Sequence, residues 1–177
     1  VSTFAGTGQY GLVDGAATAA TFRRPLGVAV DATTLDVFVA DTENNVIRKL
    51  DHTNNWAVST FAGSSTYGYR DDAAQPLNAH FRQPSALVFN SAGVLFVADS
   101  HNHCIRKVSG PAVSSFAGSC TNAGFKDGAG SAAQFHFPTA IAVDSSDNLF
   151  VSDGFNYAIR KITPAGVVTT LAAGQGN

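Results

Sequence analysis

Charge is scarce in this sequence. Charged residues make up 14% of the 177 residues, against roughly 25% in an average globular protein. The formal net charge is −2 and the isoelectric point about 6.2, so there is no excess positive charge to attract nucleic acid or anionic membranes. The chain also lacks an apolar run near the roughly 20 residues of a membrane span, and it shows no recognisable signal peptide or lipidation motif.

Methionine is absent, and the chain begins with Val1. A sequence that starts in this way is expected to be a processed product or part of a longer protein. Its 177 residues are enough to bury a sizeable core. The 17 glycines, together with many Ser, Thr, Asn and Ala residues, are typical of short strands joined by tight turns.

What the chain does contain is a repeat. The motif Asp-x-x-Asn-x-x-Ile-Arg-Lys occurs three times, with steps of 58 and 54 residues between its aspartates, at 41–49, 99–107 and 153–161. Segments similar to VSTFAG recur in the same phase, starting at Val1, Val58, Val113 and Val168. Phe-x-x-Pro and a Gly-rich loop with an aspartate also recur. A period of roughly 40–60 residues with several short strands indicates propeller blades rather than helical repeats.

The second repeat predicts four strands of about five residues each. The expected strands are 85–90, 94–98, 104–108 and 113–117. Polar or glycine-containing turns separate them, and the first two are the richest in apolar, strand-forming residues. This gradient places the first strand near the axis of a radial sheet and the fourth strand on its rim.

The repeated residues are assigned structural roles. The aspartates should accept hydrogen bonds from the backbone of the following turn, and the asparagines should do the same or adopt a positive φ. The isoleucines are expected in the core between blades. One side chain of each Arg-Lys pair should lie against the neighbouring blade, with its guanidinium on a carboxylate or a carbonyl. The positions are Asp41, Asp99, Asp153, Asn44, Asn102, Asn156, Ile47, Ile105 and Ile159.

Taken together, these motifs resemble the NHL repeat. The resemblance rests on Leu-Phe-Val-Ala-Asp, Asn-x-x-Ile-Arg-Lys, Val-x-x-Phe-Ala-Gly and the Asp-Gly-x-x-x-x-Ala-x-Phe-x-x-Pro stretch between blades, and it covers nearly the whole chain. It implies an all-β fold, a β-propeller of four-stranded antiparallel blades. The chain would hold three NHL-type blades, about half of a six-bladed ring. The predicted blades are 7–63, 64–118 and 119–177.

The chain has one more rim strand than it has blades. Segment 1–6 has no blade of its own and is expected to be the rim strand of a preceding blade or of a partner's blade. Three blades cannot close a six-bladed ring, and they would leave two apolar sheet faces open. Further blades in a longer parent chain are the favoured means of closing it, and a second copy of this chain is the alternative.

The two cysteines lie in one repeat. Pairing Val108 with Val113 in the hairpin of the third and fourth strands places Cys104 opposite Ala117, three residues from Cys120. This suggests a disulfide, and two buried free thiols are the alternative. A disulfide would indicate an oxidising compartment, so an extracellular or secreted protein is predicted.

Function is expected on the propeller face where the loops between strands two and three and the loops between blades open. Residues there that differ between repeats are better candidates for ligand contact than the repeated ones. They form a polar, aromatic and mildly basic surface, for which we predict a protein, peptide or glycan partner. The candidates are Arg23, Arg24, Glu43, Arg82, Gln83, His101, His103, His136, Phe155 and Tyr157.

The resemblance implies a protein- or RNA-binding platform, although a minority of NHL proteins are enzymes, such as a zinc-dependent lyase, and related propellers include metal-dependent lactonases. The five histidines share no phase between repeats, and two cysteines are too few for a zinc site without them. The 13 acidic residues outnumber the 11 basic ones, which disfavours RNA. We therefore predict a non-catalytic binding or assembly scaffold without metal or cofactor. A metal-dependent enzyme and an RNA platform are the alternatives.

Overall fold

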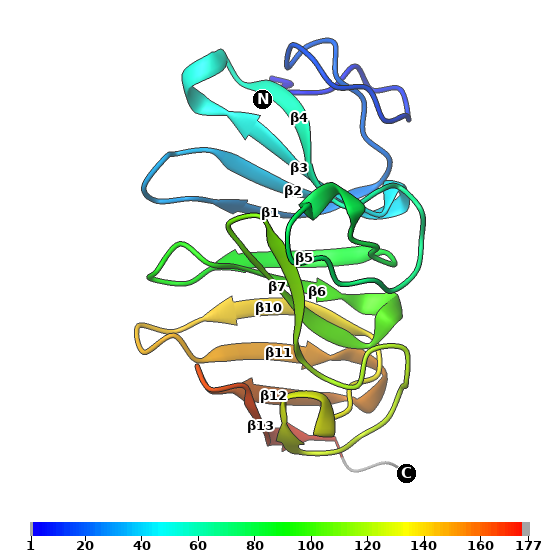
Figure 1. Cartoon of the computed structure of the whole chain (residues 1–177), viewed down its shortest axis with the longest axis vertical. Helices are drawn as coiled ribbons and strands as arrows, with labels where there is room; N and C mark the ends of the chain where they lie inside the picture. Colours follow the sequence, from blue (N-terminus) through cyan, green and yellow to red (C-terminus); the bar gives the residue numbers. More distant parts are fainter. Residues whose placement is uncertain (1, 175–177) are drawn as a thin grey trace.

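The computed structural model describes residues 2–174, which form three antiparallel sheets, two of four strands and one of five. The sheets follow one another along the molecule in chain order, as successive blades of a β-propeller do (Figure 1). The four main strands of each blade are ordered as in the sequence and form a meander, and in the third sheet a short fifth strand is added at the edge, out of sequence order. The predicted all-β propeller architecture is confirmed.

The strands of the three blades have similar lengths. Blade 1 consists of β1 (Pro25–Val30), β2 (Val37–Asp41), β3 (Val46–Asp51) and β4 (Ala57–Ala62). Blade 2 consists of β5 (Pro84–Phe89), β6 (Leu95–Asp99), β7 (Cys104–Ser109) and β8 (Ala112–Ala117). Blade 3 consists of β10 (Pro138–Val143), β11 (Leu149–Asp153), β12 (Ala158–Ile162) and β13 (Val167–Ala173), and the short β9 (Gly128–Ala129) pairs with β13.

Six one-turn 3₁₀ helices connect these strands in the described residues. They are Thr42–Asn44, His52–Asn54, Pro76–Asn78, Ser100–Asn102, Gly130–Ala132 and Gly154–Asn156. Three of them stand between the second and third strands of a blade, where the repeated motif begins. The predicted blade boundaries after residues 63 and 118 fall just beyond the ends of β4 and β8.

In blade 2 each strand begins and ends within one residue of its predicted position. The turn between β5 and β6 shows why the apolar run stops there. Oδ1 of Asn90 accepts hydrogen bonds from the N–H groups of Ala92 and Val94, and Gly93 has a φ of +72°. An asparagine that bonds its own turn, followed by a glycine that tolerates positive φ, reverses the chain.

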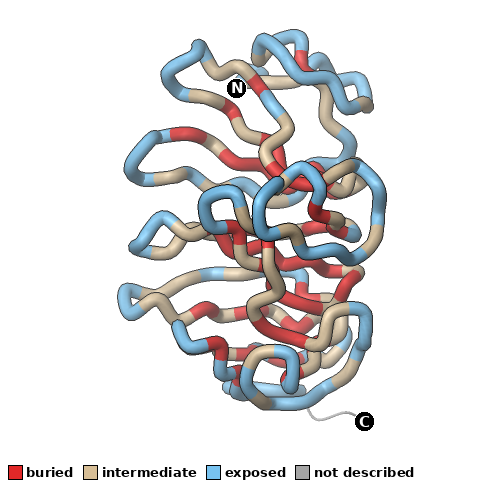
Figure 2. The backbone as a smooth tube through the Cα atoms, viewed as in Figure 1, coloured by how far each residue is buried: buried red, intermediate tan, exposed pale blue. Residues whose placement is uncertain are grey.

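Two apolar cores lie between the sheets, where buried residues concentrate (Figure 2). Phe38 and Ile47 of blade 1 pack with Leu95 of blade 2. Residues that point to the opposite side of blade 2, such as Phe96 and Ile105, pack with blade 3. Because successive side chains of a strand alternate between faces, the middle blade buries both sides of its sheet.

The outer faces of the two end blades are less covered. Ile47 and Ile105 are 0% exposed, but Ile159 is 41% exposed because no sheet follows blade 3 in the described residues. The prediction that all three isoleucines are buried is therefore wrong for Ile159. On the free face of blade 1, Val28 is 63% exposed, whereas Leu87 occupies the matching position in the core between blades 1 and 2.

The N-terminal segment lies against blade 1 as a rim strand lies against the blade that follows it. The N–H of Gly6 donates to the carbonyl of Ala17 over 2.8 Å. The glycines after β4 and β8 donate to the corresponding carbonyls of the next repeat, Gly63 to Pro76 and Gly118 to Gly130. The φ angles of the three glycines are 99°, 98° and 98°.

Residues 2–6 are nevertheless not hydrogen-bonded as a strand. The described chain offers them no third strand like β3 or β7, with which β4 and β8 pair. Val1 lies outside the described residues, as do residues 175–177. The predicted rim strand 1–6 and the predicted end of blade 3 are thus described only in part.

Candidate functional site

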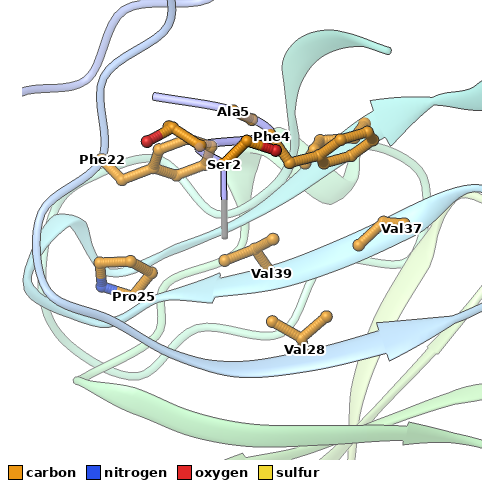
Figure 3. Close-up of a pocket in the computed structure, with 10 residues that line it drawn as sticks. Ser2, Phe4, Ala5, Phe22, Pro25, Val28, Val37 and Val39 are labelled. Atoms are coloured by element: carbon orange, nitrogen blue, oxygen red, sulfur yellow. The ribbon is translucent and has the colours of Figure 1, made fainter. Parts of the chain in front are cut away.

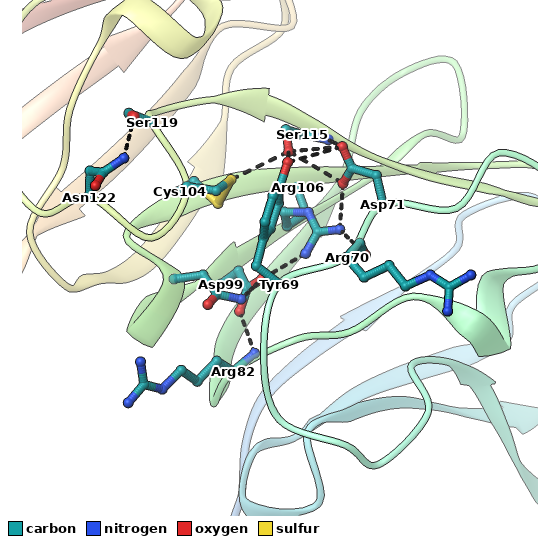
Figure 4. The surroundings of a disulfide bond; sticks show 12 residues. Tyr69, Arg70, Asp71, Arg82, Asp99, Cys104, Arg106, Ser115, Ser119 and Asn122 are labelled. Carbon is teal, nitrogen blue, oxygen red and sulfur yellow. Dashed lines mark hydrogen bonds and ion pairs between the residues drawn. A yellow bond between two sulfur atoms is a disulfide. The ribbon is translucent and has the colours of Figure 1, made fainter.

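A fully buried arginine organises each blade. In blade 2, Nη1 of Arg106 lies 2.9 Å from Oδ2 of Asp99, and Nη2 lies 2.6 Å from Oδ1 of Asp71 (Figure 4). Arg106 and Asp99 are both 0% exposed. The same two carboxylates recur around the other motif arginines, Asp41 and Asp14 around Arg48, and Asp153 and Asp127 around Arg160.

Each Nη atom of this guanidinium makes a second hydrogen bond, whereas the buried Nε has no hydrogen-bond partner among the described residues. Arg106 donates to the backbone carbonyls of His80 and Arg70, and it lies over the rings of Tyr69 and Phe81 at 5.1 Å from each centroid. The expected contacts with carboxylates and carbonyls are confirmed for the arginine of the pair. They are made, however, with β6 of the same blade and with the loop that leads into that blade, rather than with the neighbouring blade.

The motif aspartate fixes the residue in front of the first strand. Oδ1 of Asp99 accepts the N–H of Arg82 over 2.8 Å, and Oδ2 accepts the side-chain amide of Asn102. The predicted bonding to the backbone of the following turn is therefore wrong. The carbonyl of Arg82 in turn accepts the N–H of His101, so that two of the predicted site residues are held together by their backbones.

The residue directly before each first-strand proline adopts a left-handed conformation. Arg24, Gln83 and Phe137 have φ angles of 51°, 49° and 55°. A non-glycine residue in this region costs on the order of 1–3 kcal/mol, and a following proline favours an extended conformation instead. Backbone strain of this kind clusters at functional sites. Its recurrence on one surface therefore makes that surface a candidate binding site.

The same surface contains a second left-handed residue per blade, at the end of the turn between strands two and three. These residues are Asn45, His103 and Tyr157. We call the surface formed by the pre-proline residues and these turns the loop face. It comprises residues 23–24, 82–83 and 136–137 together with residues 43–45, 101–103 and 155–157.

Side chains of the loop face connect neighbouring blades. Oδ1 of Asn45 accepts the N–H of Gln83 over 2.9 Å, and Nδ1 of His103 accepts the N–H of Phe137 over 3.2 Å. An imidazole nitrogen that accepts carries no proton, so His103 is neutral in this arrangement. Burial, followed by the nearby His136, lowers the pKa of His103 and favours the same state.

The blade 1 part of the loop face is charged, and its two arginines share one carboxylate. Nε of Arg23 lies 3.2 Å from Oε2 of Glu43, and Nη1 of Arg24 lies 3.5 Å from Oε1. Both arginine side chains are more than half exposed, so these pairs contribute little to stability. They show, however, that one carboxylate fits between the two arginines.

The blade 2 part of the loop face is a polar pocket. It has a volume of about 350 Å³ and is lined by Asn45, Tyr67, Arg82, Gln83 and His101. The guanidinium of Arg82 lies 5.8 Å from the centroid of the Tyr67 ring. Burial, followed by the charge of Arg82, lowers the pKa of His101 and favours its neutral form.

Towards blade 3 the loop face becomes aromatic. Phe137 lies at the centre of four rings, with centroids 4.4 Å from His101, 5.0 Å from His103, 5.8 Å from His136 and 4.6 Å from Phe155. Two of these contacts are edge-to-face and two are tilted, and edge-to-face packing is a favourable geometry for aromatic pairs. Phe155 remains 58% exposed, so the cluster presents an apolar surface to solvent.

The structure thus brings most of the predicted residues into three adjoining groups, those of blade 1, of the blade 2 pocket and of the aromatic cluster. Tyr157 stands apart, 77% exposed beside Gly174. The sequence prediction missed Asn45, Phe137 and Tyr67. The first two occupy repeat positions equivalent to predicted residues, which was an available signal. Tyr67 has no such signal, because its counterparts in the recurring Gly-rich loop, Tyr10 and Ala123, were not among the predicted residues.

The predicted disulfide between Cys104 and Cys120 is present. The expected strand register is wrong by one residue, because a β-bulge between Ile105 and Arg106 pairs Ala117 with Ile105 instead of Cys104. Cys104 follows His103 directly, so the disulfide anchors the segment after β8 beside the loop face. The N–H of Thr121 reinforces this anchor by donating to Asn102 over 2.7 Å.

An apolar groove runs between the N-terminal segment and the free face of blade 1 (Figure 3). Its volume is about 560 Å³, and Phe4, Phe22, Val28 and Val39 are among the residues that line it. If another blade preceded blade 1, its third strand, equivalent to β3 or β7, would lie in this groove. The groove therefore belongs to the seam between blades rather than to the loop face.

Residues 2–174 contain no group of three or more His, Cys, Asp or Glu side chains placed to hold one metal ion. None of the helices in the same part of the chain is long and apolar enough to cross a membrane.

Comparisons with known proteins agree with the fold. A family model described as "NHL repeat" matches residues 22–50 and 81–108. The chain is 29% identical over 168 residues to "Protein SUPPRESSOR OF QUENCHING 1, chloroplastic" of Arabidopsis thaliana, covering 90% of this chain and 16% of that protein. It is 36% identical over 129 residues to "NHL repeat-containing protein 2" of Bos taurus, covering 66% of this chain and 18% of that one. The matches therefore span less than a fifth of either relative.

Among solved structures, an auxiliary nutrient binding protein from Bacteroides ovatus superimposes with a TM-score of 0.66 at 19% identity. The superposition covers 89% of this chain and 38% of that one. At this level of identity the likeness concerns the fold alone.

Proposed function

Because this chain carries NHL repeats, we propose that it is a non-catalytic binding segment that holds a protein partner on its loop face. The observation that carries the proposal is a row of at least partly exposed arginine, histidine and aromatic side chains at equivalent places in successive blades, some of them on strained backbone. Arginine and aromatic residues dominate the binding energy of protein interfaces.

The frame beneath the loop face suits this role. Buried aspartates hold the backbone in front of each first strand, and hydrogen bonds across the seams fix Gln83 and Phe137. A surface held in its bound shape loses little conformational entropy when a partner docks. The site therefore differs from a mobile loop in that most of its ordering is already supplied by the fold.

The disulfide supports an extracellular or secreted location as part of this proposal, since such bonds persist mainly in oxidising compartments. We also propose that further blades cover the free faces of blades 1 and 3. The exposed Val28 and Ile159 match residues that are buried between blades elsewhere in the chain, and an apolar sheet face of this kind needs a cover.

Replacing Arg24, Arg82 and His101 together with alanine should abolish partner binding without lowering the melting temperature. The three side chains are at least partly exposed, and the frame beneath them uses only their backbones. Binding is measured with peptides selected from a displayed random library against the unsubstituted protein. Alanine at both Arg70 and Lys126, which are exposed but away from the loop face, is the control. Undiminished binding by the triple variant would contradict the proposal.

A further inference from the structure

Blade 2 contains an arginine that no described residue neutralises. The sequence has seven arginines, and all of them lie within the described residues 2–174. Six form ion pairs with aspartate or glutamate, and Arg82 forms none with any described residue. Its guanidinium rests beside the Tyr67 ring and faces the blade 2 pocket.

Blade 1 shows what occupies the corresponding position. The backbones of Arg23 and Arg82 are held alike, because each donates its N–H to the motif aspartate and accepts the N–H of the residue at the middle of the next turn. In blade 1 that turn residue is Glu43, and its carboxylate meets the Arg23 side chain at 3.2 Å. In blade 2 the same turn position is occupied by His101. Blade 2 therefore keeps the arginine and lacks its carboxylate.

The other residues that line the pocket around Arg82 are polar, and each of their side chains can donate a hydrogen bond. The side chains of Tyr67, Gln83 and His101 form no hydrogen bond with any other described residue, and no aspartate or glutamate lines the pocket. Asn45 gives its carbonyl oxygen to the N–H of Gln83. A guanidinium with further donors around it matches a carboxylate, which offers acceptors only.

We infer that the blade 2 pocket binds the carboxylate of an aspartate or glutamate in the protein partner, in the place that Glu43 takes in blade 1. The inference deepens the proposed function and rests on it. The adjoining ring of Phe137, 4.4 Å from His101, together with Phe155, then receives an apolar side chain of the same partner segment. The preferred motif is an acidic residue next to a large apolar one.

The test uses peptides selected from a displayed random library on the intact protein, so that the probe is defined by its sequence. Selected peptides should be enriched in an acidic residue beside an apolar one, and replacing that acid with its amide should weaken binding about 10- to 100-fold. Arg82→Gln should weaken the acidic peptide to a similar extent and leave the amide peptide unchanged. Arg70→Gln, which removes an exposed arginine paired with Asp72, is the matched control.

A second variant distinguishes a ligand site from a general effect of charge. His101→Glu should supply the carboxylate from within the chain, pair with Arg82 as Glu43 pairs with Arg23, and weaken the acidic peptide at least as much as Arg82→Gln does. Melting temperatures of both variants should equal that of the parent protein, because neither side chain hydrogen-bonds within the described structure.

Three outcomes overturn the inference. If peptides bind the loop face without acidic preference, or with an affinity that Arg82→Gln and His101→Glu do not change, the carboxylate pocket is wrong and the proposed function stands. If no peptide binds, the proposed function fails with it. If an oligosaccharide of uronic acids binds in an Arg82-dependent manner and peptides do not, the pocket takes a carboxylate from a glycan, and the protein partner is wrong.

Discussion

Replacing Arg106 with alanine should lower the free energy of unfolding by about 3–5 kcal/mol, the typical cost of breaking a buried ion pair from one side. The change strands the fully buried Asp99 and removes the donors to two backbone carbonyls. It also leaves a void between Tyr69 and Phe81. Since small domains are stable by only about 5–15 kcal/mol, the loss is measurable by urea or thermal unfolding.

The loss of stability caused by replacing Arg106 with alanine should depend on pH. Burial raises the pKa of Asp99 to about 6, although Arg106 opposes the shift. The folded chain then binds more protons than the unfolded chain between roughly pH 4 and pH 6, so this group's contribution to stability falls as the pH rises through that window. Without Arg106 the folded-state pKa should rise further. The difference between parent and variant should therefore be smaller at about pH 5 than at about pH 7.5.

Two further variants test the cause of the loss. Lys107→Ala changes the next residue of β7, whose side chain points to the opposite face of the sheet, and should cost less than about 1 kcal/mol. Adding Asp99→Asn to the Arg106 variant should recover part of the stability, because it removes the unpaired buried charge. An Arg106 variant that unfolds like the parent at both pH values would refute the role assigned to this arginine.

The repeat made the architecture predictable. Residues that recur in phase impose the same local structure in each copy, so the strands of blade 2 could be placed within one residue from the turn at Asn90 and the proline at Pro84. The partners of the motif arginine were harder to predict from the sequence. Asp71 recurs in phase with Asp14 and Asp127, but the loop that carries these residues turns back onto its own blade, and no periodicity predicts that direction.

The site was predictable in outline and not in conformation. Alternation of strands and loops placed Arg82, His101 and His136 on one face. It gave no indication that Gln83 and Phe137 adopt a left-handed backbone, since residues before proline ordinarily avoid it. The cysteine register failed for a similar local reason, because a bulge at Ile105 shifts the pairing by one residue. Such irregularities arise from tertiary contacts, which a reading of local pattern does not contain.

Removing the disulfide should lower the free energy of unfolding by about 3 kcal/mol. Cys104 and Cys120 are separated by 16 residues, and opening a loop of this size restores roughly that much entropy to the unfolded chain. The other blades supply apolar and polar replacements that the fold already accepts. Val46 occupies the Cys104 position in blade 1. Ser65 occupies the Cys120 position, because each lies two residues after the equivalent glycine, Gly63 or Gly118. The matched variant is therefore Cys104→Val with Cys120→Ser.

These two replacements separate the effect of the cross-link on stability from the effect of side-chain packing. Reductant should destabilise the parent protein by about the same 3 kcal/mol and leave the double variant unchanged, as measured by urea unfolding with and without dithiothreitol. Because the disulfide anchors the segment that bonds Asn102, reduction should also weaken peptide binding at the aromatic end of the loop face more than at Arg82. Equal stability of the parent with and without reductant would show that the cross-link does not constrain the unfolded chain.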